Sequence, residues 1–375
     1  MNIILFFTYD ISLKDWETSG LLDRELKFYE SLNKKYSTKF KFITYGDHED
    51  RNLINLPFIE IIPVYESIKY SKNKYIRFIK SFLIPYRFAN ELKDSEIIKT
   101  NQLLGSWVAI ISKLKFEKKL IIRTGYDLVE FTKKNNKSSF KILVYSLLTK
   151  MSLRYCDLYL VSSMSDMSLV QRMSKKFKRK VHLRPNWVEI SKNNSFDKRK
   201  ENFAISVGRL EKQKNFSQLI SFLENSNLNI DIYGAGTMKS KLINEAKIKN
   251  VKLSIYEPIP NKELLNKLKN YKFFISTSLF EGNPKAILEA MASGCVVLTK
   301  KNRNVEEIIK DNFNGIFIDD RDDLLNILGN LEDDPIKWSE LSANSIETIE
   351  NKYLLENIID EEQFDYQKLS GTNDS

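Results

Sequence analysis

The stretch FFISTSLFEGNPKAILEAMASGCVVLTKKN, residues 273–302, has the order strand, loop, helix and strand. Asn283 and Pro284 are typical of a helix start, as the N-cap and the first helical residue. Glu281 lies in the loop before this helix, and Glu289 lies eight positions further along the chain. The amides at a helix start favour an anion. Two carboxylates on either side of such a site suit a ligand with central phosphates and hydroxyls at both ends, which is the layout of a nucleotide sugar.

Short apolar runs alternate with helical patterns on both sides of this stretch, which is typical of parallel β/α construction. The expected strands are 2–8, 40–45, 119–123, 157–162, 180–184, 203–207, 229–233, 251–256, 272–277, 295–299 and 315–318. Residues 139–152 are expected to form a helix that buries one apolar face, made of Phe140, Leu143, Val144, Leu147, Leu148 and Met151. The sequence therefore predicts an α/β protein with two Rossmann-like, doubly wound domains that face a central cleft, where ligands bind in such sheets.

The polar, aperiodic stretch SKNNSFDKRKEN, residues 191–202, is the expected linker between these domains. We expect an amino-terminal domain over 1–190 and a carboxyl-terminal domain over 203–349. A helix at about 350–368 is expected to pack back on the first domain, and residues 370–375 are expected to form a disordered tail.

Composition limits the classes of function. With 375 residues and 42% hydrophobic content, the chain can bury the cores of two domains, and wholesale disorder is excluded. No apolar run is long enough to span a membrane, and MNIILFFTYD is predicted to be a strand and not a signal peptide. Two distant cysteines favour a reducing, cytoplasmic setting. Because there are only two histidines, a histidine-based zinc site and a Ser-His-Asp hydrolase are poor candidates.

Charge is divided unequally along the chain. Residues 1–200 contain 38 Lys and Arg against 21 Asp and Glu, a net charge of +17, whereas residues 201–375 have a net charge of −7. The basic half favours an anionic partner, which could be a membrane surface, a pyrophosphate-linked acceptor or a nucleic acid. A lysine-rich, solvated surface explains the same charge equally well.

Two glycine-containing segments follow strands in the second half. In FAISVGRLEKQKNF, residues 203–216, the strand ends at Gly208, and Arg209 and Lys214 follow; two cations at such a place can clamp a diphosphate. Ordinary surface basicity is the alternative. In NIDIYGAGTMKSKL, residues 229–242, a lone Gly-x-Gly is a weak phosphate-binding signal, and a tight strand–helix turn explains it equally well.

The order VGRL-x3-KN, IYGAG, FEGNPKAILEAMASGCVVLT, NVEEII and NGIFI resembles the retaining glycosyltransferases of family 4, the group 1 type with the GT-B fold. The resemblance is specific over about 203–320 and looser over 1–190. It implies that the carboxyl-terminal domain binds the nucleotide sugar and that the amino-terminal domain is the acceptor side. It also implies that Arg209 and Lys214 hold the diphosphate, that Glu281 binds the donor sugar and that Glu289 binds the ribose.

The resemblance further implies that the segment 255–264 lies beside the base and that RPNWVE, residues 184–189, is the hinge motif, with Trp187 in place of a glycine. The expected catalytic residues are Arg209, Lys214 and Glu281. The expected donor-binding residues are Gly208, Tyr256, Pro258, Glu281, Gly282, Asn283, Pro284, Lys285 and Glu289.

The amino-terminal domain departs from the family pattern. The histidine that family members place after a central strand would fall at Gly125 or Tyr126 in LIIRTGYDL, residues 120–128. The early glycine-rich loop is reduced to the surroundings of Gly20. Candidate acceptor-side residues are Gly20, Arg123, Tyr126 and Asp127, although an aspartate at a strand end is often only a helix cap.

The basic aromatic stretch YSKNKYIRFIKSFLIPYRF, residues 70–88, has two interpretations. Ile76, Ile79, Leu83 and Tyr86 can lie on one helical face between Lys74, Arg77, Lys80 and Arg87, as in helices that bind anionic lipid. An ordinary core-facing helix with snorkelling lysines has the same pattern.

We therefore expect a retaining, hexosyltransferase-like enzyme that moves a sugar from a nucleotide-diphosphate sugar to a hydroxyl of a glycan or lipid-linked acceptor. The expected setting is bacterial-type surface polysaccharide or glycolipid assembly, in the cytoplasm or on the cytosolic face of a membrane. No cofactor and no metal are expected, since 319–323 and 332–334 are acidic turns. Two alternatives are a GT-B nucleotide-sugar epimerase, which needs carboxylates or histidines that the first half does not offer, and a basic nucleic-acid-binding protein, for which there is no recognition motif.

Overall fold

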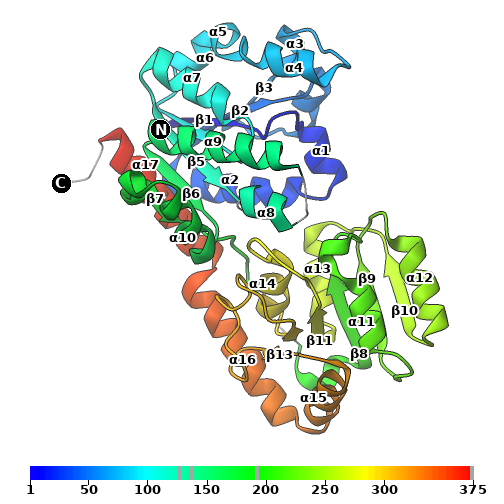
Figure 1. The fold of residues 1–375 in the computed structure, drawn as a ribbon. Helices are drawn as coiled ribbons and strands as arrows, with labels where there is room; N and C mark the ends of the chain where they lie inside the picture. Colours follow the sequence, from blue (N-terminus) through cyan, green and yellow to red (C-terminus); the bar gives the residue numbers. More distant parts are fainter. Residues whose placement is uncertain (126–127, 135–137, 191–193, 372–375) are drawn as a thin grey trace. The chain divides into compact units, whose positions relative to one another are not determined.

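The computed structural model describes residues 1–125, 128–134, 138–190 and 194–371. The chain divides into two compact units, each a parallel sheet covered by helices (Figure 1). Unit 1 comprises Met1–Pro185 and Ile358–Ser375, and unit 2 comprises Asn186–Asn357. The two α/β domains expected from the alternating pattern are therefore present, and each is described below on its own.

Unit 1 has a seven-stranded parallel sheet in the order β3-β2-β1-β4-β5-β6-β7. Its strands are β1 (Asn2–Phe6), β2 (Lys39–Thr44), β3 (Ile59–Pro63), β4 (Ile97–Thr100), β5 (Lys119–Thr124), β6 (Leu158–Val161) and β7 (Val181–Leu183). Its helices are α1 (Leu13–Thr18), α2 (Leu22–Tyr36), α3 (Val64–Ser67), α4 (Lys74–Ser81), α5 (Ile84–Arg87), α6 (Ala89–Lys93), α7 (Ser106–Phe116), α8 (Leu128–Lys134), α9 (Ser139–Tyr155) and α10 (Met164–Met173).

Two strands of unit 1 are absent from the sequence-based prediction. β4 pairs with β1 and β5 near the middle of the sheet, but its four residues include the buried Lys99, which interrupts the apolar run. β3 is the edge strand and contains Glu60 and Pro63, both typical of an edge. Each strand thus lacks the apolar pattern from which the others are predictable.

Unit 2 has a six-stranded parallel sheet in the order β10-β9-β8-β11-β12-β13. Its strands are β8 (Lys200–Val207), β9 (Asn229–Tyr233), β10 (Lys252–Tyr256), β11 (Tyr271–Ser276), β12 (Val296–Thr299) and β13 (Ile316–Phe317). Its helices are α11 (Phe216–Phe222), α12 (Lys239–Ile248), α13 (Asn261–Leu268), α14 (Lys285–Ala292), α15 (Arg321–Asp333) and α16 (Pro335–Lys352).

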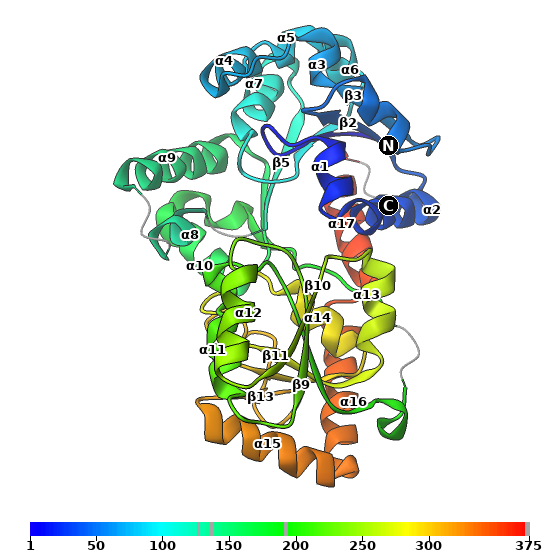
Figure 2. The same cartoon turned by 90° about the vertical axis from the view of Figure 1, so that its right-hand side faces the viewer.

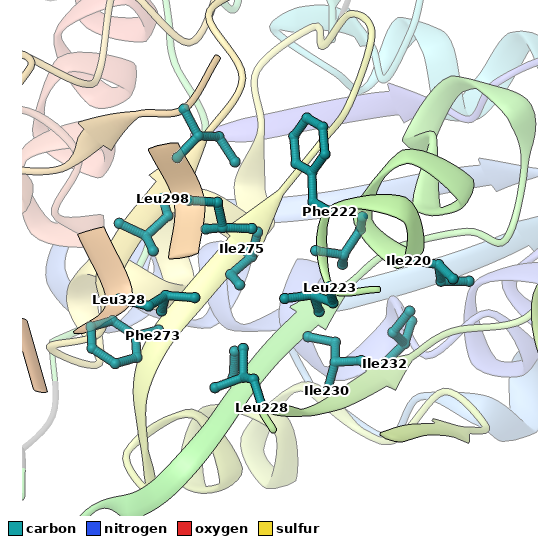
Figure 3. Packing of buried hydrophobic residues seen from close by; sticks show 14 of the residues in the cluster. Ile220, Phe222, Leu223, Leu228, Ile230, Ile232, Phe273, Ile275, Leu298 and Leu328 are labelled. Atoms are coloured by element: carbon teal, nitrogen blue, oxygen red, sulfur yellow. The ribbon is translucent and has the colours of Figure 1, made fainter. Parts of the chain in front are cut away.

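The core of unit 2 has two layers because successive strand residues point to opposite faces of a sheet. On β11, Phe273 and Ile275 join one cluster with residues of α11, α12 and α15, including Ile220 and Leu328 (Figure 3). Phe274 points to the other face and packs with residues of α13 and α14. Both faces of the sheet are therefore covered, as a parallel sheet requires.

The division between the units falls at Pro185–Asn186, earlier than the linker expected at 191–202. The described part of that stretch belongs to unit 2. Asn194 Nδ2 donates to Lys269 O at 3.1 Å, and Arg199 Nη1 donates to Tyr271 O at 2.7 Å. The polar residues of this stretch are therefore hydrogen-bonded to the rest of unit 2, which their polarity alone does not predict.

The last helix, α17 (Leu355–Ser370), belongs to unit 1 from Ile358 onward. Tyr36 OH donates to Asp360 Oδ1 at 2.7 Å, and Lys99 and Glu362 form a fully buried ion pair. Unit 1 is thus assembled from two segments that are distant in the sequence.

The apolar face expected to be buried on 139–152 is exposed instead. The helix itself is present as α9, but of the six side chains only Leu148 is buried, whereas Phe140 is 72% exposed. The residues 70–88 likewise form the short helices α4 and α5, on which Ile79 is 67% exposed and Tyr86 is 59% exposed. The core-facing interpretation of that stretch is therefore wrong for these side chains. In the described part of the chain, every helix is too short or too polar to cross a bilayer.

Candidate functional site

The candidate site lies at the carboxyl edge of the unit 2 sheet, between β8 and β11. These strands are neighbours in the sheet, but the chain continues from β8 to β9 on one side and from β11 to β12 on the other. In doubly wound sheets ligands bind at such a switch point, because the two loops leave the sheet in opposite directions. The loop after β8 contains Gly208, Arg209 and Lys214, and the loop after β11 contains Glu281.

An ion pair links the two loops at this switch point. Lys214 Nζ lies 2.6 Å from Glu281 Oε1, and the two side chains are only 18% and 8% exposed. Lys214 ends the 3-10 turn Lys212–Lys214, and its aliphatic stem packs on Gly208, where a Cβ atom would lie 2.9 Å from Lys214 Cε. The structure thus brings together two of the three expected catalytic residues, and the stem of the lysine lies against the backbone of Gly208.

The third expected catalytic residue, Arg209, is exposed, and its Nη2 lies 3.5 Å from Gln213 Oε1. Gln213 also holds the two loops together, since its Nε2 donates to Phe280 O at 2.9 Å and its carbonyl oxygen accepts from Leu279 N at 3.0 Å. Sequence reasoning missed Gln213 because a glutamine between two lysines has no distinguishing pattern.

The Gly-x-Gly of residues 234–236 packs one loop against another. A Cβ atom at Gly234 would lie 1.9 Å from Gly208 O, and Leu210 N donates to Ala235 O at 2.8 Å. The loops after β8 and β9 therefore approach closely only because Gly234 has no side chain. This close approach accounts for the glycine, in agreement with the tight-turn interpretation.

Three asparagines fix the loop that precedes α14. Asn304 Nδ2 donates to Glu281 O at 2.8 Å and to Gly282 O at 2.5 Å, and Asn186 Nδ2 donates to Asn283 O at 3.2 Å. Asn302 Nδ2 donates to Ser278 O at 3.4 Å. None of the three is among the site residues expected from the sequence, because an amide that binds a loop carbonyl leaves no spacing signal. Together they fix the backbone of this loop through its carbonyl groups.

The helix after this loop begins one residue later than predicted. Pro284 is the N-cap and α14 begins at Lys285, so Asn283 is not the N-cap. Proline fixes its own φ but has no side-chain acceptor, so it sets the entry angle without capping the first amides. Lys285 Nζ lies 4.1 Å from the centre of the Trp187 ring. The tryptophan that replaces the hinge glycine of the family therefore forms a cation–π contact with α14.

Glu289 is buried on α14, and its Oε1 accepts a hydrogen bond from Asn261 Nδ2 at 2.8 Å. Asn261 is the first residue of α13, at the end of the segment 255–264. In the same segment Pro258 is exposed, and Tyr256 stacks on Tyr233 with 4.8 Å between ring centres. The structure thus connects the expected ribose carboxylate to the expected base segment through Asn261, another residue that the sequence did not single out.

The acceptor-side candidates of unit 1 have local structural explanations where they are described. Gly20 has a φ of 69° just after α1, which is the left-handed backbone that ends helices. Arg123 is on β5, and its backbone N donates to Thr100 Oγ1 at 3.3 Å. Tyr126 and Asp127 lie outside the described residues. The structure therefore gives these two described residues no feature that points to a ligand.

Unit 1 has a switch point of its own, between β1 and β4. In the loop after β1, Asp10 has a φ of 65° and receives two hydrogen bonds from Arg77 of α4, at 2.8 Å and 2.5 Å. Tyr65 OH donates to Asp10 Oδ1 at 3.1 Å. This cluster, also missed from sequence, anchors α4 at the carboxyl edge of the unit 1 sheet.

The acidic groups expected in turns at 319–323 and 332–334 lie at the two ends of α15, and Asp322, Asp323, Glu332 and Asp333 belong to the helix itself. Asp320 accepts from Asp323 N at the start of α15, and Asp334 accepts from Lys337 N at the start of α16. Within the part of the chain that the structure describes, no cluster of three His, Cys, Asp or Glu residues has the geometry to hold a metal ion.

Comparisons with known proteins agree with this architecture. Residues 188–350 match the family model described as "Glycosyl transferases group 1". The capsular polysaccharide biosynthesis glycosyltransferase CapH of Staphylococcus aureus is 28% identical over 252 residues, which cover 62% of this chain and 68% of that protein. The N-acetylgalactosamine-N,N'-diacetylbacillosaminyl-diphospho-undecaprenol 4-alpha-N-acetylgalactosaminyltransferase of Campylobacter jejuni is 26% identical over 273 residues, which cover 68% of this chain and 72% of that protein.

Among solved structures, Anabaena Alr3699/HepE in complex with UDP has a TM-score of 0.75 at 13% identity, covering 98% of this chain and 100% of that chain. At that identity the likeness concerns the fold. Residues 188–350 therefore match the group 1 glycosyltransferases, and the chain that contains them has the GT-B fold.

Proposed function

We propose that unit 2 binds a nucleotide-diphosphate sugar between the loops after β8 and β11, and that the enzyme transfers the sugar to an acceptor hydroxyl with retention of configuration. The observation that carries this proposal is the Lys214–Glu281 ion pair at the switch point of the sheet. A shielded lysine and carboxylate at this place supply one group for a phosphate and one for sugar hydroxyls. UDP is the nucleotide bound in the structural relative Alr3699/HepE, so UDP-sugars are the first donors to test.

Donor binding would rearrange the ion pair. A diphosphate bound by Lys214 replaces Glu281 as the partner of the ammonium group, and the freed carboxylate then accepts hydrogen bonds from sugar hydroxyls. Lys214, Arg209 and the amides at the start of α14 would stabilise the charge that develops on the departing diphosphate. Because these groups are cationic or dipolar, we propose that transfer needs no metal ion.

Retention is proposed to arise from attack on the same face that the diphosphate leaves. The acceptor oxygen forms a bond to the anomeric carbon as the bond to the diphosphate breaks, and a donor phosphate oxygen takes the acceptor's proton. No protein base is then required, in keeping with the absence of a histidine from LIIRTGYDL. The name of the Campylobacter relative includes an alpha linkage, and retention from an alpha-linked donor would give such a linkage.

We propose assembly of a bacterial surface polysaccharide or glycolipid as the setting, on a glycan or lipid-linked acceptor. The names of the relatives support this, one for capsular polysaccharide and one for a diphospho-undecaprenol acceptor. An epimerase on the same scaffold would instead release a free sugar epimer without an acceptor.

We also propose that residues 70–88 contact an anionic membrane on its cytosolic face. No acidic residue occurs from Ser67 to Asn90, whereas Lys72, Lys74 and Lys80 do. The Arg77–Asp10 ion pair ties α4 to the loop after β1. A lipid-linked acceptor that contacts α4 would therefore lie beside the carboxyl edge of the unit 1 sheet.

A thermal-shift panel tests the donor site. UDP-, GDP-, ADP- and CMP-linked sugars are added without metal to the wild type and to Glu289→Ala. One nucleotide class is expected to raise the Tm of the wild type, by an amount that corresponds to about 2.7 kcal/mol when the ligand is at 100 times its Kd. Glu289→Ala should remove the shift, because it removes the carboxylate that Asn261 orients. Equal shifts in both proteins would place the nucleotide elsewhere.

A further inference from the structure

Helix α9 exposes a continuous apolar stripe along its whole length. Phe140, Leu143 and Leu147 are 72%, 57% and 56% exposed, and Val144 and Met151 are 40% and 36% exposed. Each of these positions lies three or four residues from another one, so they share one face of the helix. Scattered exposed apolar residues are ordinary, but a stripe of five on one helix marks a contact surface.

The opposite face of α9 is already occupied by the interior of unit 1. Leu148 and Leu153 are buried, and Ser152 Oγ donates to Ser106 Oγ of α7 at 3.1 Å. α9 is therefore apolar on two sides, a pattern that requires an apolar environment on both. Within unit 1, the described residues supply only one of them.

The charges around the stripe identify what covers the other side. Residues 138–156 contain no Asp or Glu, and the three charged residues, Lys141, Lys150 and Arg154, are all exposed. A second copy of this chain docked by the same face would bring like charges together. An anionic lipid bilayer instead offers negative headgroups for the cations and acyl chains for the stripe.

We propose that α9 inserts its apolar stripe into the interface of an anionic bilayer, as a second lipid-contacting element besides residues 70–88. α5 and α9 both pack against α7, so the two elements flank one helix of unit 1 (Figures 1 and 2). On α7 itself Leu114 is 57% exposed, and Lys115 lies over the ring of Tyr86 at 3.7 Å. The basic and apolar surface therefore continues from one element to the other. This inference does not depend on the donor chemistry, and vesicle binding is measured without any sugar.

Vesicle co-sedimentation of the full chain is the first test. Vesicles of phosphatidylcholine with about 30% phosphatidylglycerol, which gives an anionic surface, are compared with vesicles of phosphatidylcholine alone. Leu143→Ser/Leu147→Ser is expected to weaken binding to the anionic vesicles at least about tenfold, because two inserted leucines lose their transfer free energy. The matched control is Ile248→Ser/Ile336→Ser in unit 2, where both isoleucines are exposed, and it should bind like the wild type.

Two results would overturn the proposal. One is unchanged binding of Leu143→Ser/Leu147→Ser, which would leave residues 70–88 as the sole lipid contact. The other is a wild-type dimer in light scattering that this variant abolishes, which would make a second copy the occupant. An unchanged UDP-sugar thermal shift in the variant shows that the donor site is intact, so failure here is separable from failure of the proposed function.

A fluorescence measurement distinguishes insertion from surface adsorption. Leu147→Cys carries an environment-sensitive dye, and both native thiols are buried; burial raises the pKa of Cys156 to about 12 and that of Cys295 to about 11. The dye at 147 should shift to the blue on addition of anionic vesicles, whereas a dye on Ile248→Cys should not. A dye at 147 that stays in water while the protein sediments would contradict insertion.

Discussion

Lys214→Ala is expected to lower the turnover number of sugar transfer about 100- to 1,000-fold, the usual cost of removing one preorganised group that stabilises developing negative charge. The lysine is held in place before the donor arrives, since its stem packs on Gly208 and its ammonium lies 2.6 Å from Glu281 Oε1. Alanine would remove the charge and leave a carboxylate that is only 8% exposed without this partner. Steady-state kinetics with saturating donor measure the effect.

Lys212→Ala is the matched control for this prediction. Lys212 belongs to the same 3-10 turn but is exposed, so its removal should leave the turnover number within about twofold of the wild type. The double variant Lys214→Ala/Glu281→Gln also removes the carboxylate that Lys214→Ala would leave unpaired. Its turnover number should remain low. If Lys214→Ala alone transferred sugar as fast as the control, the diphosphate would have to be held by other groups.

Lys99→Met should have the largest effect on stability, a loss of about 3–5 kcal/mol in the free energy of unfolding of unit 1. Lys99 on β4 and Glu362 on α17 are 2% and 0% exposed and form an ion pair. Burial alone would raise the pKa of Glu362, but the charges of Lys99 and Arg184 lower this pKa to about 2. Removing the lysine therefore leaves a charged group inside the protein with one of its two compensating cations missing.

Urea unfolding followed by fluorescence measures this loss. The double variant Lys99→Met/Glu362→Leu should recover most of the stability, because a buried pair is often replaceable by apolar residues of similar size. Lys35→Met is the control: Lys35 and Asp360 also link α2 to α17, but both are about half exposed, and the change should be small. Equal losses in Lys99→Met and Lys35→Met would refute the role assigned to burial.

The donor half of the fold is predictable from sequence because its chemistry is local. Most strands of unit 2 contain a short apolar run, and Gly208, Lys214 and Glu281 follow two of these strands within a few residues. Their meeting follows from the rule that the carboxyl ends of parallel strands lie at one edge.

The parts that the sequence did not predict depend on partners far along the chain. Lys99 prevents β4 from being predicted as a buried strand, because a lysine is not expected inside a protein. Its partner in the buried ion pair, Glu362, lies 263 residues later in the chain. Asn304, Asn261 and Gln213 position the site through side-chain hydrogen bonds to groups on other loops or on α14. Such hydrogen bonds require no periodicity and no fixed spacing in the sequence, so no sequence pattern predicts them.

The face of α9 illustrates a different limit. Periodicity correctly predicts a helix with an apolar stripe at Phe140, Leu143 and Leu147, but it cannot distinguish a protein interior from a lipid bilayer. Both environments exclude water, and both select the same residues. Only the exposure of the folded helix separates them.

The most direct test of the central claim is product analysis by NMR with a nucleotide sugar that raises the Tm, in the presence of a chelator. We expect release of the nucleoside diphosphate and a sugar product with the anomeric configuration of the donor, at a rate that the chelator does not change and that Lys214→Ala lowers about 100- to 1,000-fold. An inverted product, a rate that depends on added metal, or a donor that binds without ever releasing its diphosphate would contradict the account.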